Sequence, residues 1–308
     1  MKKRIAILGA GPIGIEAALR ALEDGHQVEV YEQGGVGAHV ERWQHVKFFS
    51  PWALNRSRRA ESLLTDLGMS LASGAVYPSG RQYLDEYLRP LAASRALLSR
   101  IRLRTSVVGV ARSHAMKGEW IGRPERGAAP FVIQVQQLGQ ERFVEADVVV
   151  DATGVLENPN RLGPGGLAAV GEGLAEPYID RGIPDILGGA REHYAGRRVL
   201  VVGEGYSAAT SLQLLSELRR DAPGTQISWV MRSTEAPYRV IADDSLPERA
   251  SLIQFANAAA RGQVEGLSPL NGSTILEFEP TDEGIRVEID RLGKEQRFMV
   301  DRIISNVG

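Results

Sequence analysis

The chain has 308 residues, of which 24% are charged and 43% hydrophobic, and its formal net charge is −2. This length is enough for two domains with separate cores, and the near-balanced charge gives no electrostatic footprint for nucleic acid. The sequence contains no cysteine, which excludes a dithiol reductase, a thiolate-ligated metal site and a disulfide scaffold.

The residues at the N-terminus lead us to expect no targeting signal. The apolar run that follows Arg4 stops at Gly9, too early for the hydrophobic region of a secretory signal, and no apolar run in the chain approaches a membrane span. We therefore expect a cytoplasmic protein that does not associate with membranes. His39 and His45 flank Glu41 without further nearby ligands, so no metal site is predicted.

The first glycine-rich turn follows the apolar strand 4–8 and precedes the amphipathic run 13–22. Gly9 permits a tight turn, Gly11 lets backbone amides approach a pyrophosphate, and Gly14 lets the helix pack against the sheet. The next strand, 27–31, stops at Glu32, whose carboxylate suits the hydroxyls of an unphosphorylated ribose, as in FAD or NAD. The candidate contacts of this turn are Gly9, Gly11, Pro12, Ile13, Gly14, Glu32 and Gln33.

A glycine-rich loop, 34–37, and an aromatic segment, 43–52, follow Glu32. The aromatic segment either covers a bound isoalloxazine, with Phe49 and Ser50 as contacts, or forms a small satellite core. Helices are predicted over Arg56–Leu67 and Arg81–Leu98 from the spacing of their apolar residues.

Strand-like segments occupy 101–143 and predict one strand after the helices and then a β meander, with 117–130 as an exposed loop. The valine-rich run 146–150 predicts a buried strand. It ends in Ala152-Thr153-Gly154, small residues that let the backbone approach a ligand at the carboxyl end of a parallel strand.

A second glycine-rich turn follows the strand 198–202 and has Gly203 and Gly205 at the same spacing as the first turn. The next strand, 226–231, stops at Arg232. A guanidinium binds a 2′-phosphate that a carboxylate would repel, so Arg232, with the hydroxyl of Ser233 beside it, predicts NADPH. The candidate contacts of this turn are Gly203, Gly205, Tyr206, Ser207, Ala208, Arg232 and Ser233.

Together, these motifs resemble those of the flavoproteins with two dinucleotide-binding domains, in particular the flavin-containing monooxygenases that use NADPH. The resemblance implies an α/β fold with two Rossmann-like, three-layer (ββα/βαβ) domains, the NADPH domain inserted into the FAD domain, and a β meander. It also places the first turn and Glu32 on FAD, Val107 or Val108 near its adenine, and Ala152–Gly154 at the crossover from the FAD domain.

The expected domain boundaries follow from the resemblance. Residues 1–160 would form the N-terminal part of the FAD domain, with the meander at about 101–145; 161–195 would be a linker, and 196–300 the NAD(P)H domain. Residues 301–308 would begin the return to the FAD domain. The family adds a later strand that ends in Gly-Asp, so we expect either a truncated chain or a short natural protein with an incomplete flavin site.

The implied activity is that of an FAD-dependent oxidoreductase. NADPH would reduce the flavin, and the reduced flavin would capture oxygen as a hydroperoxide that oxygenates a small molecule. Two alternatives stay open: a reductase that passes electrons to a partner or quinone, and a non-catalytic dinucleotide-binding sensor. No side chain is assigned as catalytic because the cofactor supplies the chemistry, and a homo-oligomer is compatible with the sequence.

Overall fold

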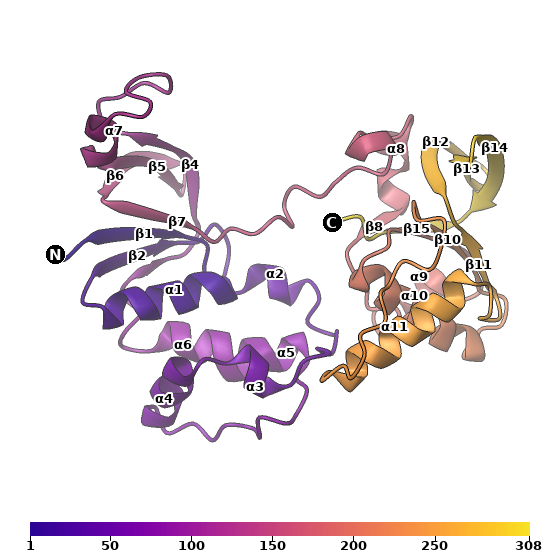
Figure 1. Ribbon diagram of the computed structural model, residues 1–308, viewed down its shortest axis with the longest axis horizontal. Helices are drawn as coiled ribbons and strands as arrows, with labels where there is room; N and C mark the ends of the chain where they lie inside the picture. Colours follow the sequence, from indigo (N-terminus) through magenta and orange to yellow (C-terminus); the bar gives the residue numbers. More distant parts are fainter. The chain divides into compact units, whose positions relative to one another are not determined.

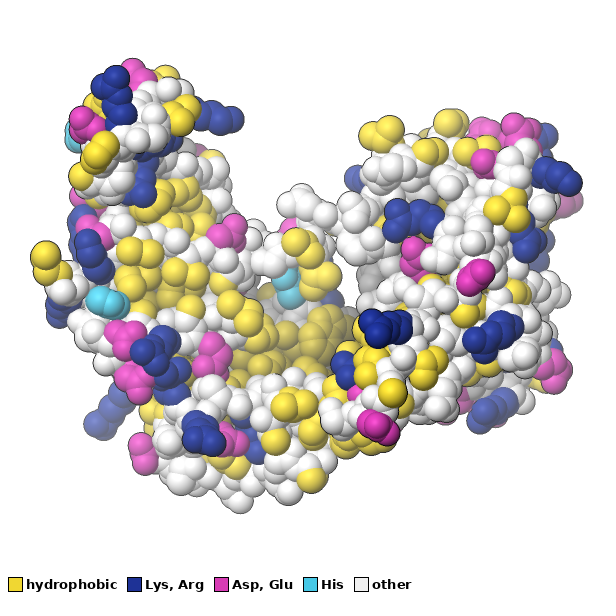
Figure 2. Space-filling view, in the orientation of Figure 1, with side chains coloured by type: hydrophobic (Ala, Val, Ile, Leu, Met, Phe, Trp, Pro, Cys, Tyr) yellow, Lys and Arg dark blue, Asp and Glu magenta, His cyan; other side chains and the backbone are white.

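The computed structural model describes residues 1–308, which form two compact units, Met1–Gly154 (unit 1) and Val155–Gly308 (unit 2). Figure 1 shows a sheet with helices in each unit. None of the helices has the length and apolarity needed to cross a bilayer. Basic and acidic side chains are interspersed on the visible face of both units (Figure 2), so neither sign of charge dominates there.

Unit 1 is built on a parallel sheet with the strand order β3-β2-β1-β7. Its strands are β1 (Arg4–Leu8), β2 (Gln27–Tyr31), β3 (Ile101–Arg102) and β7 (Val148–Asp151). Side chains alternate between the two faces of a strand, so Ile7 of β1 packs with the helices while Ala6 and Leu8 face the meander. The β1 strand therefore contributes to two separate hydrophobic clusters.

The meander of unit 1 covers one face of this sheet. It consists of the antiparallel strands β4 (Thr105–Arg112), β5 (Phe131–Gln137) and β6 (Gln140–Ala146). Ile133 and Val135 of β5 are fully buried against Leu8 and Tyr31. The predicted meander is confirmed, and it begins at Thr105. Ile101 lies in the parallel strand β3, which agrees with the strand predicted after the helices.

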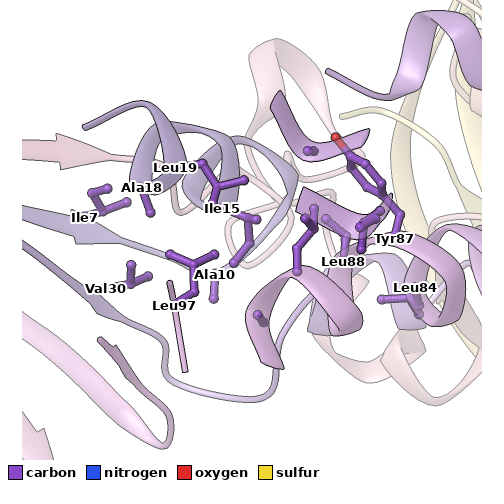
Figure 3. Close-up of a cluster of buried hydrophobic side chains, with 14 of the residues drawn as sticks. Ile7, Ala10, Ile15, Ala18, Leu19, Val30, Leu84, Tyr87, Leu88 and Leu97 are labelled. Carbon is purple, nitrogen blue, oxygen red and sulfur yellow. The ribbon is translucent and has the colours of Figure 1, made fainter. Parts of the chain in front are cut away.

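Helices cover the opposite face of the same sheet. They are α1 (Pro12–Glu23), α4 (Arg58–Asp66), α5 (Gly80–Tyr83), the π-helical turn η1 (Leu84–Leu88) and α6 (Arg89–Ala93). Figure 3 shows Ile15 and Leu19 of α1 in the cluster that also contains Leu84 and Leu88. Short elements complete the unit: α2 (Ala38–Glu41), α3 (Trp52–Asn55) and α7 (Pro124–Ala128).

Two expectations for unit 1 need correction. The helix predicted over Arg81–Leu98 ends at Ala93 and contains the π turn. Pro90 has no amide hydrogen for the carbonyl four residues earlier, which accounts for the change of register. The strand predicted as buried is only half-buried, with Val148 36% exposed, because β7 lies at the edge of the sheet.

Unit 2 contains a five-stranded parallel sheet with the order β11-β10-β9-β15-β8. Its strands are β8 (Ile179–Arg181), β9 (Arg198–Val202), β10 (Gln226–Val230), β11 (Leu267–Leu270) and β15 (Arg302–Ser305). One face packs against α10 (Tyr206–Asp221) and α11 (Pro247–Ala260). The other packs against the meander β12 (Ser273–Thr281), β13 (Gly284–Arg291) and β14 (Lys294–Val300).

The segment predicted as a linker, 161–195, belongs to the second compact unit. It supplies β8 to the sheet, together with η2 (Pro164–Gly166), α8 (Glu172–Ala175), η3 (Glu176–Tyr178) and α9 (Arg191–Tyr194). The buried Glu172 carboxylate holds the start of this segment by accepting hydrogen bonds from the amides of Leu162 and Ala169 at 3.0 and 2.9 Å.

The last strand also lies in unit 2. β15 pairs with β9 and β8, and the two units divide at residues 154 and 155 rather than at 160. Residues 302–305 are therefore part of the second sheet. The expected insertion of one domain into the other stays a prediction.

The two units share one plan, which in unit 2 begins at β9, after the additional strand β8: a strand, a glycine turn and a helix, two further parallel strands, a meander and a final strand beside the first strand of the plan. In each unit an arginine that opens the first strand pairs with an aspartate just before the final strand. Arg4 and Asp147 form this pair in unit 1, and Arg198 and Asp301 in unit 2, with side-chain contacts of 3.1 and 2.6 Å. The pairs join the end of each meander to the start of β1 and β9, respectively.

We expect Asp301→Asn to destabilise unit 2. Asp301 accepts hydrogen bonds from the Arg198 amide at 2.7 Å and from its guanidinium, and hydrogen bonds to a charged group that is partly exposed contribute about 1–2 kcal/mol in total. Urea unfolding at neutral pH measures the loss. Asp282→Asn, which changes an exposed carboxylate in the β12–β13 turn, is the control and should leave the transition in place.

The effect of Asp301→Asn should depend on pH. Burial raises the pKa of Asp301, but its bonds to Arg198 lower that pKa by more, so the net shift is downward. A carboxylate with a lowered pKa in the folded state stabilises the protein above its unfolded pKa of about 3.9, and this contribution is lost as pH falls through the folded pKa. The difference between wild type and variant should narrow below about pH 4; a constant difference would contradict the ion pair.

Candidate dinucleotide sites

The glycine turn of unit 1 connects β1 to α1 and contacts the end of β7. The Gly9 amide donates a hydrogen bond to the Tyr31 carbonyl at 2.7 Å, and its φ of +101° is a conformation that favours glycine. A Cβ on Gly9 would lie 2.6 Å from the carbonyl oxygen of Ala152, whereas a Cβ on Gly11 would meet nothing within 4 Å. The first glycine is thus required by packing, and the second leaves open space at the helix N-terminus.

Pro12 begins α1 and Ile13, 69% exposed, borders the open side of the turn. Gly14 is buried, and a Cβ there would clash with the carbonyl of Gly9. The first amides of a helix have no partner within the helix, and the open space beside Gly11 lies next to them.

Glu32 lies beside this turn with its side chain almost fully buried. Its Oε2 accepts a hydrogen bond from the Ala10 amide at 2.8 Å, and its Oε1 accepts one from the Gly34 amide at 2.7 Å. A carboxylate has about four acceptor positions, so ribose hydroxyls can still donate to it. Gln33, the next residue, is exposed.

The Ala152–Gly154 segment lies against the same turn, because Ala152 is in close contact with Gly9. Asp151 orders the segment: its Oδ1 accepts hydrogen bonds from the Thr153 hydroxyl at 2.7 Å and the Thr153 amide at 3.0 Å, and these bonds lower its pKa. A Cβ on Gly154 would lie 3.8 Å from Nδ1 of His39. The structure thus adds His39 to this neighbourhood, which the sequence pattern did not indicate.

The remaining candidates of unit 1 are placed less centrally. Val107 packs in the cluster beneath Leu8 and Tyr31, while Val108 is 55% exposed. The first residue of β4, Thr105, donates its amide to the Glu32 carbonyl at 2.9 Å. This places the start of the strand that carries both valines next to the acid.

Most of the aromatic segment packs into the main hydrophobic cluster of unit 1. The rings of Trp43 and Phe48 have centroids 5.4 Å apart, Phe48 lies 5.2 Å from Tyr83, and Trp52 lies 5.7 Å from Tyr83. These rings therefore extend the core between the sheet and its helices rather than forming a separate satellite core, and a role in covering a flavin stays a prediction. Phe49 is partly exposed, and Ser50 interacts with the side-chain amide of Asn55.

The turn of unit 2 repeats the geometry of the first. Gly203 has φ +129°, its amide donates to the Val230 carbonyl at 3.1 Å, and a Cβ would clash with the carbonyl of Asn306. A Cβ on Gly205 would again meet nothing within 4 Å. Tyr206 and Ser207 open α10, and Ala208 is fully buried where unit 1 has Gly14.

Arg232 and Ser233 follow β10 and lie beside this turn, together with an acid that the sequence analysis missed. Glu204 Oε2 accepts a hydrogen bond from the Ser233 amide at 2.9 Å. Its Oε1 lies 3.5 Å from Nη2 of Arg232, a side chain that is 82% exposed. The signal in the sequence was an acid inside the glycine turn itself.

A cavity of about 760 Å³ adjoins the second turn. Glu204, Gly205 and Tyr206 line one part of it, and residues 237–242 line another. The Tyr238 hydroxyl donates to the Gly205 carbonyl at 2.7 Å.

Asn257 of α11 fixes the segment that carries Tyr238. Its Oδ1 accepts the Tyr238 amide at 3.2 Å and its Nδ2 donates to the Tyr238 carbonyl at 2.8 Å. Asn257 is itself 3% exposed, so the wall of the cavity is anchored in the core of the unit.

Both sites offer what the ADP half of a dinucleotide needs: an open glycine before a helix N-terminus and a carboxylate nearby. Each unit carries one such turn. The residues present fit an ADP-containing cofactor in each unit.

No protein-family model matches the chain. Among curated proteins it is 26% identical over 226 residues to a 4-hydroxybenzoate brominase (decarboxylating) of Marinomonas mediterranea, covering 71% of this chain and 37% of that protein. It is 24% identical over 315 residues to human putative dimethylaniline monooxygenase [N-oxide-forming] 6, covering 91% of this chain and 52% of that protein. The chain thus spans about half or less of the length of these relatives.

Among solved structures, a bacillithiol disulfide reductase from Bacillus cereus superposes with a TM-score of 0.69 at 20% identity, covering 100% of this chain and 78% of that one. The ornithine N-hydroxylase of Kutzneria sp. 744, determined with reduced FAD, NADP⁺ and L-ornithine, superposes with a TM-score of 0.65 at 15% identity, covering 100% and 81%. The expected α/β class and the resemblance to flavoproteins with two dinucleotide-binding domains are confirmed: the chain has the fold of these FAD- and NAD(P)-dependent oxidoreductases.

Proposed function

We propose that the protein is an FAD-dependent oxidoreductase in which NADPH reduces the flavin, and that it acts as a monooxygenase on a small molecule. The observation that carries the proposal is the repeated turn: Gly9 and Gly203 pack against a neighbouring strand end while Gly11 and Gly205 leave open space. One chain with two such sites suits a pair of dinucleotides that exchange electrons.

Unit 1 is assigned to FAD. Glu32 places a carboxylate for the ribose hydroxyls at the end of β2, and the start of α1 supplies amides for the pyrophosphate. Ala152–Gly154 form the neighbouring strand end, and we assign Val107 or Val108 to the adenine and Phe49 and Ser50 to the flavin end. Unit 2 is assigned to NADPH through Gly203, Gly205 and the residues around Arg232.

When bound, FAD supplies the redox chemistry and the reaction with oxygen. The chain's own residues bind and orient the cofactors: the turns fix the pyrophosphates and the strand ends fix the riboses. Binding and orienting the cofactors needs no side-chain acid or base, and we therefore assign no catalytic side chain. The monooxygenase name of one relative and the hydroxylase name of one similar structure support this outcome.

A reductase is the second candidate, because another similar structure is a disulfide reductase. This chain has no cysteine, so electrons would leave the flavin directly for a partner or a quinone. The two candidates differ in the fate of the reduced flavin in air.

The decisive experiment is a visible absorption spectrum of the protein with FAD, before and after anaerobic NADPH and then on admission of air. Flavin bands that bleach with NADPH would support the redox pair. A transient oxygen adduct would favour the monooxygenase, and direct reoxidation without an adduct the reductase. A protein that takes up no flavin would overturn the proposal in favour of a nucleotide-binding sensor.

We expect Glu32→Arg to weaken flavin retention by one to two orders of magnitude. The substitution removes an acceptor of the ribose hydroxyls and leaves the amides of Ala10 and Gly34 without their partner. Flavin released on gel filtration measures the loss. The control is Glu29→Gln, which changes a half-exposed acid within β2 that pairs with Arg102; unchanged retention in Glu32→Arg would contradict the assignment of unit 1.

Gly11→Ala should separate binding from folding. Gly11 has φ −78° and open space around it, so alanine should leave the thermal unfolding midpoint unchanged while its methyl group blocks the approach of a pyrophosphate. Gly9→Ala is the contrasting variant, because its Cβ would clash with Ala152 and its φ is unfavourable for alanine. Thermal unfolding and flavin titration of both variants test this: normal FAD binding by Gly11→Ala would contradict the site.

A further inference from the structure

The backbone register gives a residue-by-residue equivalence between the two sites. The first glycine of each turn donates to the last carbonyl of the next strand, Tyr31 in unit 1 and Val230 in unit 2. Glu32 therefore corresponds to Met231, not to Arg232. By the same register Gln33 corresponds to Arg232, Gly34 to Ser233 and, within the turn, Ala10 to Glu204.

A carboxylate faces the same backbone amide in both units. In unit 1, Glu32 accepts from the Gly34 amide at 2.7 Å; in unit 2, Glu204 accepts from the equivalent Ser233 amide at 2.9 Å. The strand-end position itself holds the buried apolar Met231 in unit 2. The acid therefore comes from the strand end in unit 1 and from the glycine turn in unit 2, but in both units its carboxylate binds the equivalent backbone amide.

Arg232 is held weakly by comparison. Its Nη2 lies 3.5 Å from Glu204 Oε1, beyond the usual range of 2.7–2.9 Å for charge-assisted hydrogen bonds. The arginine side chain is 82% exposed and that of Glu204 only 26%. The guanidinium is therefore free to turn toward a ligand, whereas the carboxylate is fixed by a backbone hydrogen bond.

The turn that carries Glu204 is braced from a second direction. The Tyr238 hydroxyl bonds the carbonyl of Gly205, and Asn257 clamps the backbone of Tyr238 at both its amide and its carbonyl. Glu204 also lines the cavity beside the turn. These contacts hold the backbone of the turn, and the Ser233 amide holds the Glu204 carboxylate itself.

Resting on the function proposed above, we propose that Glu204 determines the pyridine-nucleotide preference of unit 2. Its carboxylate accepts a hydrogen bond from the 2′-hydroxyl of NAD(H) and repels the 2′-phosphate of NADP(H), whereas the Arg232 guanidinium attracts that phosphate. The two side chains act in opposite directions, so the wild-type protein discriminates weakly between the two cofactors. NADPH use then depends on Arg232 outweighing its neighbour.

The test is isothermal titration of the whole protein with NADP⁺ and with NAD⁺, in the presence of saturating FAD so that unit 1 is occupied. Oxidised nucleotides do not reduce the flavin, so the readout is affinity alone. Glu204→Gln keeps an oxygen for the Ser233 amide and removes the charge. It should tighten NADP⁺ binding roughly tenfold, the effect of one lost repulsion at hydrogen-bonding range, and leave NAD⁺ equal or weaker.

Further variants and a charge-matched control make the result easier to interpret. Glu204→Ala introduces the residue that unit 1 has at this position, so it provides a second test if the glutamine variant folds poorly. Arg232→Ala should weaken NADP⁺ more than NAD⁺, and more strongly in the Glu204→Gln background than in wild type. Glu295→Gln, an exposed acid on β14, is the charge-matched control and should change neither affinity.

The outcomes separate this inference from the proposed function. If NADP⁺ binding weakens in Glu204→Gln, then Glu204 positions Arg232 for the phosphate and the inference is overturned. An equal change for both nucleotides would also overturn it, while leaving nucleotide binding by unit 2 intact. Failure of wild type and every variant to bind either nucleotide would overturn both the inference and the assignment of unit 2.

Discussion

The close approach of a glycine to the backbone of a neighbouring strand end organises each unit. Gly9 lies against the Ala152 carbonyl and Gly203 against the Asn306 carbonyl, at distances that exclude any side chain. This contact brings the turn that follows β1 or β9 against the carboxyl end of the neighbouring strand, β7 or β15. The open second glycine and the helix N-terminus depend on it, because the turn keeps its shape only while the strand end lies beneath it.

The same plan appears twice, down to the arginine and aspartate that join the start of the first strand to the end of the meander. Strands with alternating apolar side chains explain why both faces of each sheet are covered, one by helices and the other by a meander. The turn and the strands beside it are therefore common to both units, although unit 2 has the additional strand β8 and unit 1 has additional helices between β2 and β3. Beside the turns the two units also differ in charge: unit 1 has Ala10 and Glu32 where unit 2 has Glu204 and Met231.

The contrast between Glu32 after β2 and Arg232 after β10 overstates the difference in charge between the two sites. Unit 1 places one buried carboxylate beside its turn, and unit 2 places both a fixed carboxylate and an exposed guanidinium there. On the inference proposed above, a carboxylate and a guanidinium would act in opposite directions on one ribose position, so small changes in sequence would shift cofactor preference. Nucleotide choice in unit 2 would then depend on the balance between these two adjacent side chains.

The sequence alone determined the two turns, their glycines, the helices after them and the meander of unit 1, because local sterics and the alternation of apolar residues govern these features. Only the tertiary structure placed 161–195 in unit 2, with β8 and residues 302–305 in its sheet, and β7 at an exposed edge, since strand partners are chosen over long range. It also showed that Arg232 corresponds to Gln33 and that Glu204 supplies a second carboxylate. Register and side-chain direction decide such equivalences, and neither can be read from residue spacing.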